Sequence, residues 1–152
     1  MPPVISLRDV VEALDFQSDE LSSYLDPDTG EIITFNQEEA GVAQHGDWNL
    51  APDWMRGLLP KIKRALEDDR MLALPDRIHI DEWRMMQDFA DEQEKDNARA
   101  LLSSAAHGAG AFRRFRLAVA TLGMEECWRC YRDKAMADVA RQWLEENNLK
   151  YR

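Results

Sequence analysis

Residues 21–35 read Leu-Ser-Ser-Tyr-Leu-Asp-Pro-Asp-Thr-Gly-Glu-Ile-Ile-Thr-Phe and contain the clearest strand pattern in the chain. Two runs, Leu21–Leu25 and Glu31–Phe35, carry aromatic and β-branched side chains and flank Asp26–Gly30. In that connection the proline presets its own φ and the glycine supplies a positive φ, as a tight turn requires. The stretch predicts a β-hairpin, which must pack against helices because a lone hairpin is barely stable in water.

Helices are predicted on both sides of the hairpin within the first 76 residues. Ser6 can cap a helix from Leu7 to about Phe16, whose apolar residues recur with helical spacing. Beyond the hairpin, the predicted elements are a helix at 37–44 capped by Asn36, a helix at 58–69 and an extended stretch at 72–75 that can add a third strand. An irregular passage carrying Trp48 and Trp54 separates these two helices.

The second half of the chain predicts four helices, at about 81–92, 94–107, 111–122 and 124–147. Asp81 can cap the first of them, and glycine ends the second and third, in the position that favours a left-handed conformation. The side chains predicted to face inward are, helix by helix, Trp83, Met86, Phe89 and Ala90; Ala98, Leu101, Leu102 and Ala105; Phe112, Phe115, Val119 and Leu122; and Trp128, Tyr131, Ala135, Val139 and Trp143.

The predicted fold class is therefore α+β and mostly α. An N-terminal helix and a small antiparallel β-hairpin pack with a C-terminal helical half of about four helices. We expect a single domain over residues 1–152, because no stretch has the composition of a linker and no internal repeat is visible.

Length and composition restrict the class of protein. The 152 residues suffice for a core without disulfides or a structural metal, and 7 Gly with 6 Pro exclude collagen-like, mucin-like and low-complexity chains. The longest uncharged stretch, Ala100–Phe112, has 13 residues, whereas a bilayer span needs about 20. The first residues lack the basic start and apolar block of a secretory signal, and two cysteines three positions apart cannot staple a fold. We expect a soluble cytoplasmic protein.

Charge is divided unevenly along the sequence. Residues 1–76 hold 6 basic and 16 acidic residues, so this acidic half carries the whole net charge of −10. Residues 77–152 hold 13 of each sign, and most of the arginines. This pattern excludes a uniformly basic nucleic-acid binder but permits a local basic patch. The acidic half can keep the protein soluble, face a basic partner or mimic nucleic acid.

Residues 108–116, which read Gly-Ala-Gly-Ala-Phe-Arg-Arg-Phe-Arg, form the best candidate binding segment. Glycines before a helix let backbone N–H groups approach a ligand, and a helix N-terminus favours negative charge. Arg113 and Arg116 share one side of the predicted helix, where guanidinium groups can bind phosphate or carboxylate oxygens. The candidate binding residues are Gly110, Phe112, Arg113, Arg114, Arg116 and Arg132.

Two explanations of this segment stay open at the level of sequence. It can contact a phosphate, a nucleic-acid backbone or an acidic protein segment. Alternatively, the glycines make a tight turn between helices and the arginines pair with local carboxylates. The segment lacks the Lys-Ser/Thr of a P-loop and a preceding strand, so it does not predict nucleotide hydrolysis.

Other chemistry-bearing patterns predict neither a cofactor nor a metal. Cys127-Trp-Arg-Cys130 follows no strand and lies beside two glutamates that disfavour a thiolate, so we expect partly buried free thiols. His79-Ile-Asp81-Glu82 matches no metal-ligand spacing. Asp26-x-Asp28-x-Gly30 begins like a calcium loop, but the twelfth position is Gln37 instead of Glu. No acid–base pair for catalysis can be selected.

Aromatic residues and one charged pair complete the set of candidates. Trp128 and Trp143 are predicted to belong to the core, whereas Trp48 and Trp54 can anchor a partner from their irregular passage. Arg132-Asp133 predicts a structural ion pair that locks the last two helices together.

Several of these stretches resemble one bacterial family. The resemblance rests on residues 110–116, Trp128, Tyr131-Arg132-Asp133 and Trp143–Asn148, and on the earlier stretches Ser6–Leu14, Ser22–Glu31 and Leu74-Pro75. The chain is similar to the uncharacterised protein family numbered 0158 from about Ser6 to Leu149. It departs from the family pattern at Leu144, where Cys is expected. The resemblance implies a small cytoplasmic bacterial protein and transfers no activity, because the family has none assigned.

Three hypotheses for function follow. The first is a non-enzymatic binding or adaptor protein that uses the arginine-bearing helix or the acidic half, with a protein partner and no membrane. The second is a nucleic-acid or phosphate-binding protein in which Arg113, Arg114 and Arg116 contact phosphates. The third is an enzyme of unrecognised class. The first is favoured because charge is segregated and no catalytic constellation is legible.

Overall fold

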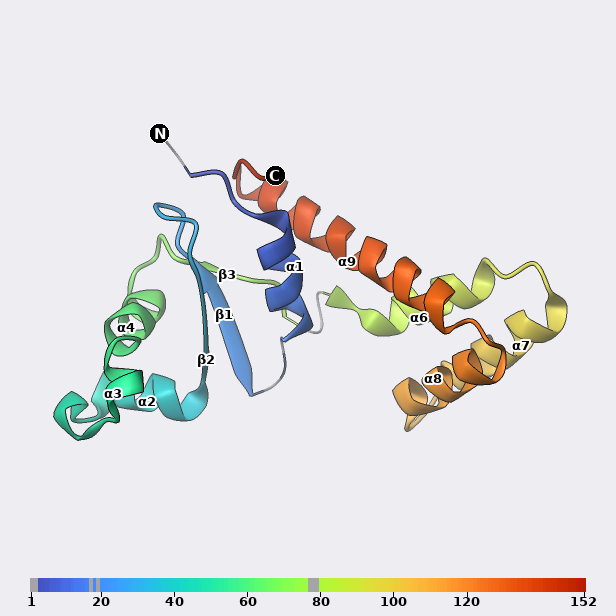
Figure 1. Ribbon diagram of the computed structural model, residues 1–152, viewed down its shortest axis with the longest axis horizontal. Helices are drawn as coiled ribbons and strands as arrows, with labels where there is room; N and C mark the ends of the chain where they lie inside the picture. Colours follow the sequence, from blue (N-terminus) through green and yellow to red (C-terminus); the bar gives the residue numbers. More distant parts are fainter. Residues whose placement is uncertain (1–2, 17, 19, 77–79) are drawn as a thin grey trace. The chain divides into compact units, whose positions relative to one another are not determined.

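A computed structural model describes residues 3–16, 18, 20–76 and 80–152 (Figure 1). The protein is α+β and mostly helical, which confirms the predicted fold class. The chain divides into two compact units. The first comprises residues 1–79 and 139–152, and the second comprises residues 80–138. That the whole chain forms a single domain stays a prediction.

The sheet of the first unit is built on the predicted hairpin. Strands β1 (Leu21–Leu25) and β2 (Ile32–Asn36) pair antiparallel, and β3 (Leu72–Ala73) pairs with the other edge of β1. The turn closes as predicted, because the Asp26 N–H donates to the Glu31 carbonyl at 2.8 Å and Gly30 adopts a φ of 80°. The predicted third strand is confirmed.

Local capping explains where the first helices begin. Helix α1 (Leu7–Asp15) starts at Ser6, whose side chain accepts from the Asp9 N–H. Helix α2 (Gln37–His45) starts with a reciprocal capping box between Asn36 and Glu39. The passage that follows, predicted to be irregular, contains the 3₁₀ turn η1 (Trp48–Leu50) and the short helix α3 (Asp53–Arg56). Helix α4 (Leu59–Glu67) begins with a proline in its first turn, where no backbone N–H is needed.

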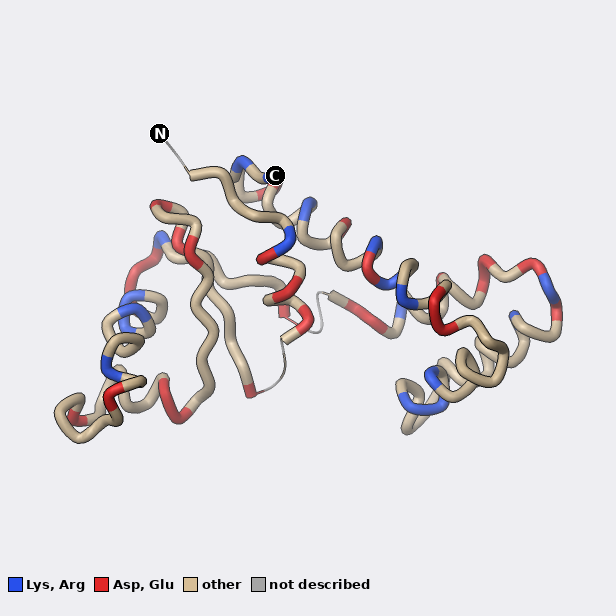
Figure 2. Tube along the Cα trace, viewed as in Figure 1, with Lys and Arg blue, Asp and Glu red and all other residues tan. Residues whose placement is uncertain are grey.

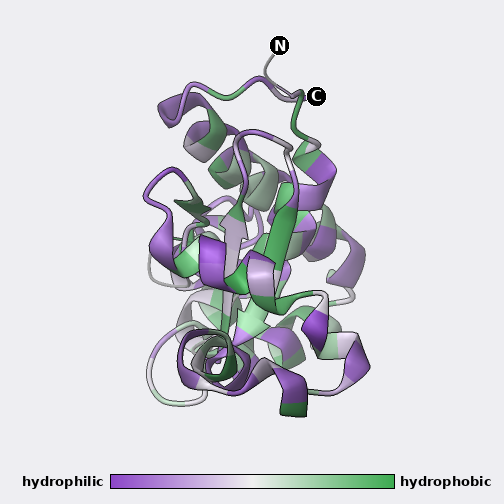
Figure 3. Ribbon diagram, turned by 90° about the vertical axis from the view of Figure 1, so that its left-hand side faces the viewer, coloured by the Kyte–Doolittle hydropathy of each residue, from purple (hydrophilic) through white to green (hydrophobic). Residues whose placement is uncertain are grey.

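One face of the sheet forms the core of the first unit with α2 and α4. Phe35 of β2 is buried, packs in one cluster with Ile62 of α4, and stacks on Tyr24 with a centroid distance of 5.7 Å. Helices turned toward the viewer in Figure 3 show alternating hydrophobic and hydrophilic residues, as amphipathic helices do. The segment before α1 lies beside the last residues of the chain (Figure 1), because the Ile5 N–H donates to the Lys150 carbonyl and the Ile5 carbonyl accepts from the Arg152 N–H.

The second unit consists of helices packed around one apolar core. It contains α6 (Glu82–Asp91), α7 (Asp96–Ala105), α8 (Ala111–Thr121) and the first part of α9 (Glu125–Glu146), whose last turns belong to the first unit. Phe115 of α8 is fully buried and lies edge-on to Trp128 of α9, with ring centroids 4.9 Å apart. Phe89 of α6 lies edge-on to both rings.

Several residues predicted to face inward do not. Trp83, Leu101 and Phe112 keep 40% or more of their surface exposed. The Trp83 indole N–H donates to the Ala106 carbonyl, so its ring lies at the edge of the core with a satisfied donor. In α9 the fully buried side chains are Met136, Ala140 and Leu144, each one position after a predicted inward residue. Trp128 and Tyr131 are only partly buried against the core, as their size favours.

Candidate functional site: an exposed arginine-bearing helix face

The loop before α8 is a tight turn held by an arginine. Gly108 and Gly110 both have positive φ, at 83° and 73°, and Gly110 is the N-terminal cap of α8. Arg114 folds back over this loop, where its guanidinium donates to the carbonyls of His107 and Ala109. A Cβ atom at either glycine would lie within 3.5 Å of that guanidinium. Gly110 and Arg114 therefore build the turn together.

Arg113 and Arg116 have a different environment. Both are exposed, and neither forms an ion pair with any residue that the structure describes. At about 100° per residue, Arg113 lies opposite the buried Phe115 and Arg116 lies beside Arg113, to the flank of the buried stripe. Leu117 lies on the same side with 59% of its surface exposed, and Phe112 lies at its edge with 40% exposed. We call Phe112, Arg113, Arg116 and Leu117 the α8 face.

The α8 face belongs to a segment of the chain whose charged residues are all basic. Residues 108–124 carry three arginines and no acidic residue, within a chain that has 29 acidic residues in total. Figure 2 shows α8 in blue and tan, without red. Guanidinium groups beside exposed apolar side chains can bind carboxylates and cover apolar surface at the same time. Leu117 was missed in the sequence, although its helical position beside Arg113 would have identified it.

Arg132 lies on α9 and is not part of the α8 face. It forms an ion pair with Glu82, and both side chains are about three-quarters buried. The pair joins α9 to α6, whereas the sequence predicted a pair between the last two helices. The reason is that helix order in the chain does not fix which helices pack together.

The two cysteines are free thiols on the surface. Cys127 and Cys130 are exposed, lie one turn apart near the start of α9 and are not bonded to each other. The Cys130 Sγ lies 3.9 Å from a carboxylate oxygen of Glu126. The prediction of free thiols is confirmed, but the predicted partial burial is wrong, because both side chains lie on the exposed side of α9.

Potential metal ligands are dispersed in the part of the chain that the structure describes. No three His, Cys, Asp or Glu side chains there gather as a metal site would require. Asp81 caps α6 as predicted, accepting from the Arg84 N–H. His79 lies outside the described residues. His107 packs against Trp83, with ring centroids 5.8 Å apart.

The carboxylates of the hairpin turn are used in ion pairs. Asp26 is buried and binds Arg64 at 2.6 Å, while Asp28 contacts both Arg64 and Arg70 at 3.2 and 3.3 Å. Glu31 binds Lys61 at 2.6 Å. These ion pairs connect the turn to α4 and to the segment after it. The acidic turn that superficially resembled a calcium loop therefore uses its carboxylates to stabilise the fold.

Trp48 and Trp54 differ in their roles. Trp48 packs partly buried against the core of the first unit, and its indole N–H donates to the Ala43 carbonyl. Trp54 keeps 65% of its surface exposed beside a groove between α2 and α3. Only the second tryptophan is therefore available to a partner.

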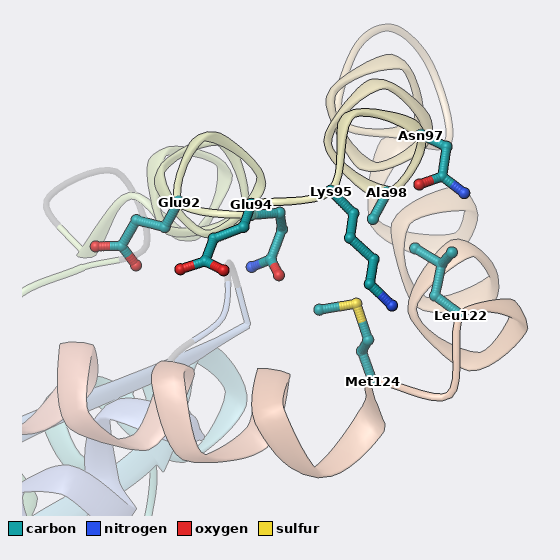
Figure 4. A pocket seen from close by; sticks show the side chains of 8 residues that line it. Glu92, Glu94, Lys95, Asn97, Ala98, Leu122 and Met124 are labelled. Carbon is teal, nitrogen blue, oxygen red and sulfur yellow. The ribbon is translucent and has the colours of Figure 1, made fainter.

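A hollow of about 530 Å³ lies in the second unit beside the connection from α6 to α7 (Figure 4). Lys95 extends toward Met124, whereas the carboxylates of Glu92 and Glu94 point away from it. Nearby, burial and then the carboxylates of Glu92 and Asp88 raise the pKa of Tyr131, so this phenol keeps its proton at neutral pH. In Figure 4 the Lys95 amine and the two glutamate carboxylates do not point toward one another.

No helix among the described residues is both long and apolar enough to cross a bilayer.

No protein-family model, curated protein or solved structure matches the sequence or the fold.

Proposed function

We propose that this chain is a non-enzymatic cytoplasmic binding protein whose α8 face contacts an acidic surface of a protein partner. The single observation that carries this proposal is the pair of exposed arginines, Arg113 and Arg116, left without ion partners among the described residues of an acidic chain. Two exposed apolar side chains, Phe112 and Leu117, adjoin them. Aromatic residues and arginine are enriched at protein interfaces.

A protein partner fits this face better than nucleic acid does. Arg114 is occupied by the turn, so only two of the three clustered arginines remain for phosphates. Nucleic-acid affinity depends on neutralising many phosphates, and a chain with a net charge of −10 is repelled by a polyanion. Exposed Phe112 and Leu117 gain more from an apolar protein surface.

The test compares three baits in affinity capture from cell extract, read by quantitative mass spectrometry. The baits are the wild-type chain, R113E/R116E and the control R8E/R129E, which changes the net charge equally at exposed positions on α1 and α9. We expect specific proteins on the wild type and the control that are lost from R113E/R116E. Identical sets on all three baits would overturn the proposal. Circular dichroism verifies that each variant is folded.

The nucleic-acid alternative is tested with the same variants. Labelled single- and double-stranded RNA and DNA are titrated at two salt concentrations and followed by fluorescence anisotropy. Binding that weakens with salt and disappears in R113E/R116E would replace the protein partner by a nucleic acid. The proposal expects flat titrations with all four probes.

A further inference from the structure

A groove in the first unit presents apolar side chains within an acidic rim. Its volume is about 470 Å³, and it lies between α2 and the segment of η1 and α3. The residues that matter to a ligand are Glu38, Val42, Asp47, Leu50, Trp54 and Met55. Leu50 and Trp54 expose 84% and 65% of their surfaces, which is unusual for such large apolar side chains.

Polar contacts hold this segment in a fixed conformation. The Arg56 guanidinium donates to the carbonyls of Asn49 and Ala51, at 2.9 and 3.0 Å. Asp47 caps the turn by accepting from the Asn49 N–H at 2.9 Å. Leu50 and Trp54 are therefore presented by an ordered backbone, so a partner that covers them has little conformational entropy to remove.

The charge of the groove is the opposite of the charge around α8. Residues 36–56 contain four acidic residues and one arginine, a formal charge of −3, whereas residues 108–124 have a formal charge of +3. Red segments follow α2 and the loop after it in Figure 2, in contrast to the blue of α8. Each surface also exposes two large apolar side chains, Leu50 and Trp54 in one case and Phe112 and Leu117 in the other.

We infer that the groove of one copy receives the α8 face of a second copy of this chain. The inference rests on the proposed function and names the partner surface. Phe112 and Leu117 cover Leu50 and Trp54, while Arg113 and Arg116 face the carboxylates at the rim, among them Glu38. Opposite charges around an apolar centre are the usual composition of a specific interface.

The two sides of this contact are different, which determines the kind of assembly. Two copies can exchange faces reciprocally and close as a pair, or copies can add head to tail. In both arrangements the average molar mass in solution rises with protein concentration. The net charge of −10 on each copy opposes association at low salt, and this long-range repulsion is screened at about 0.1 M salt, where the Debye length is about 10 Å.

Charge reversal on either side separates this contact from non-specific association. R113E/R116E makes the α8 face acidic, and E38K/D53K makes the groove region basic at two exposed residues that cap no helix by a side-chain bond. Asp53 pairs with Arg56 at 3.3 Å, so circular dichroism and the urea midpoint of E38K/D53K must match those of the wild type. Each variant alone then presents two surfaces of like charge. A mixture of the two restores one wild-type contact and creates one reversed contact.

The experiment is sedimentation equilibrium of full-length protein at about 0.1 M salt, from low to high micromolar concentration. We expect the wild type and R8E/R129E to associate. The dissociation constant of each reversed variant should be at least about ten-fold higher. The mixture of the two reversed variants should recover the wild-type mass. W54S, which alters only an exposed side chain, must also weaken association.

Each outcome separates the inference from the proposed function. A wild type that stays monomeric throughout overturns the second copy as partner, while proteins captured through Arg113 and Arg116 would still support the α8 face. If R113E/R116E associates as strongly as the wild type, the proposed contact is wrong and the copies associate through another surface. A mixture that stays monomeric although the wild type associates contradicts the pairing of these two surfaces.

Discussion

Neighbouring arginines in α8 have separate roles, and two hydrogen bonds from Arg114 to the preceding loop distinguish them. Arg114 satisfies two loop carbonyls that have positive-φ glycines beside them, whereas the Arg113 side chain extends from the exposed side of the helix. The residue type alone does not show which of the two positions is structural, because both residues are arginine. Only the geometry of the preceding turn decides which of them stabilises the fold.

Replacing Arg114 should therefore cost stability, and replacing Arg113 should not. We expect R114A to lower the free energy of unfolding by about 1 kcal/mol, the typical net value of a hydrogen bond. R113A should change it by no more than about 0.5 kcal/mol, as exposed substitutions usually do. Urea denaturation of both variants measures the difference. Equal stabilities would mean that Arg114 does not support the turn.

At the scale of elements, the carboxylate of Asp68 at the end of α4, which pairs with Arg64 and Arg70, responds to pH. The Arg70 backbone N–H, followed by the side chains of Arg70 and Arg64, holds the pKa of Asp68 below its ordinary value of 3.8. A carboxyl whose pKa is lower in the folded state contributes stability above pH 3.8 and loses it as the pH falls through the folded value.

Acid unfolding of the D68N variant tests this contribution. We expect the free energy of unfolding of the wild type to fall more steeply with decreasing pH below 3.8 than that of D68N. The two curves run parallel above that pH, where the wild-type carboxylate stays ionised. Parallel curves at every pH would show that Asp68 titrates equally in the folded and unfolded chain.

The rotation of α8 about its axis decides which phenylalanine is structural. Phe115 is fully buried between the rings of Phe89 and Trp128, whereas Phe112 borders the α8 face. We expect F115A to lose about 3–5 kcal/mol of unfolding free energy, as buried aromatic residues do. F112A should lose less than about 1 kcal/mol. Thermal and urea unfolding measure both, and a cost for F112A close to that for F115A would contradict this rotation.

Local signals in the sequence predicted most elements but not their packing. Ser6, Asn36 and Asp81 cap helices as predicted, because a cap depends only on residues within one turn. Phe112 and Phe115 both fit an inward stripe at a spacing of three, and only the neighbours supplied by α6 and α9 decide between them. Arg113 and Arg116 were identifiable as a pair from helical spacing alone. The exclusion of Arg114 required the geometry of the turn before α8, and that of Arg132 required its tertiary contact with Glu82.

At the scale of the whole molecule, α9 is the element that the two units share. Its first part contributes Trp128 and Tyr131 to the core of the second unit, and its last turns belong to the first. Met136, Ala140 and Leu144 along this helix are buried. Helix formation is cooperative along a continuous segment, so loss of one unit would remove support from part of a helix that the other unit needs.

We therefore expect the protein to unfold in a single transition. I62A empties a fully buried position in the first unit, and L102A does so in the second, each at an expected cost of about 2–5 kcal/mol. If the units are coupled, either variant lowers the midpoint of the entire far-ultraviolet circular dichroism transition and keeps the calorimetric and van't Hoff enthalpies equal. Two resolved transitions, of which each variant shifts only one, would instead show that the units unfold separately and that α9 breaks between them.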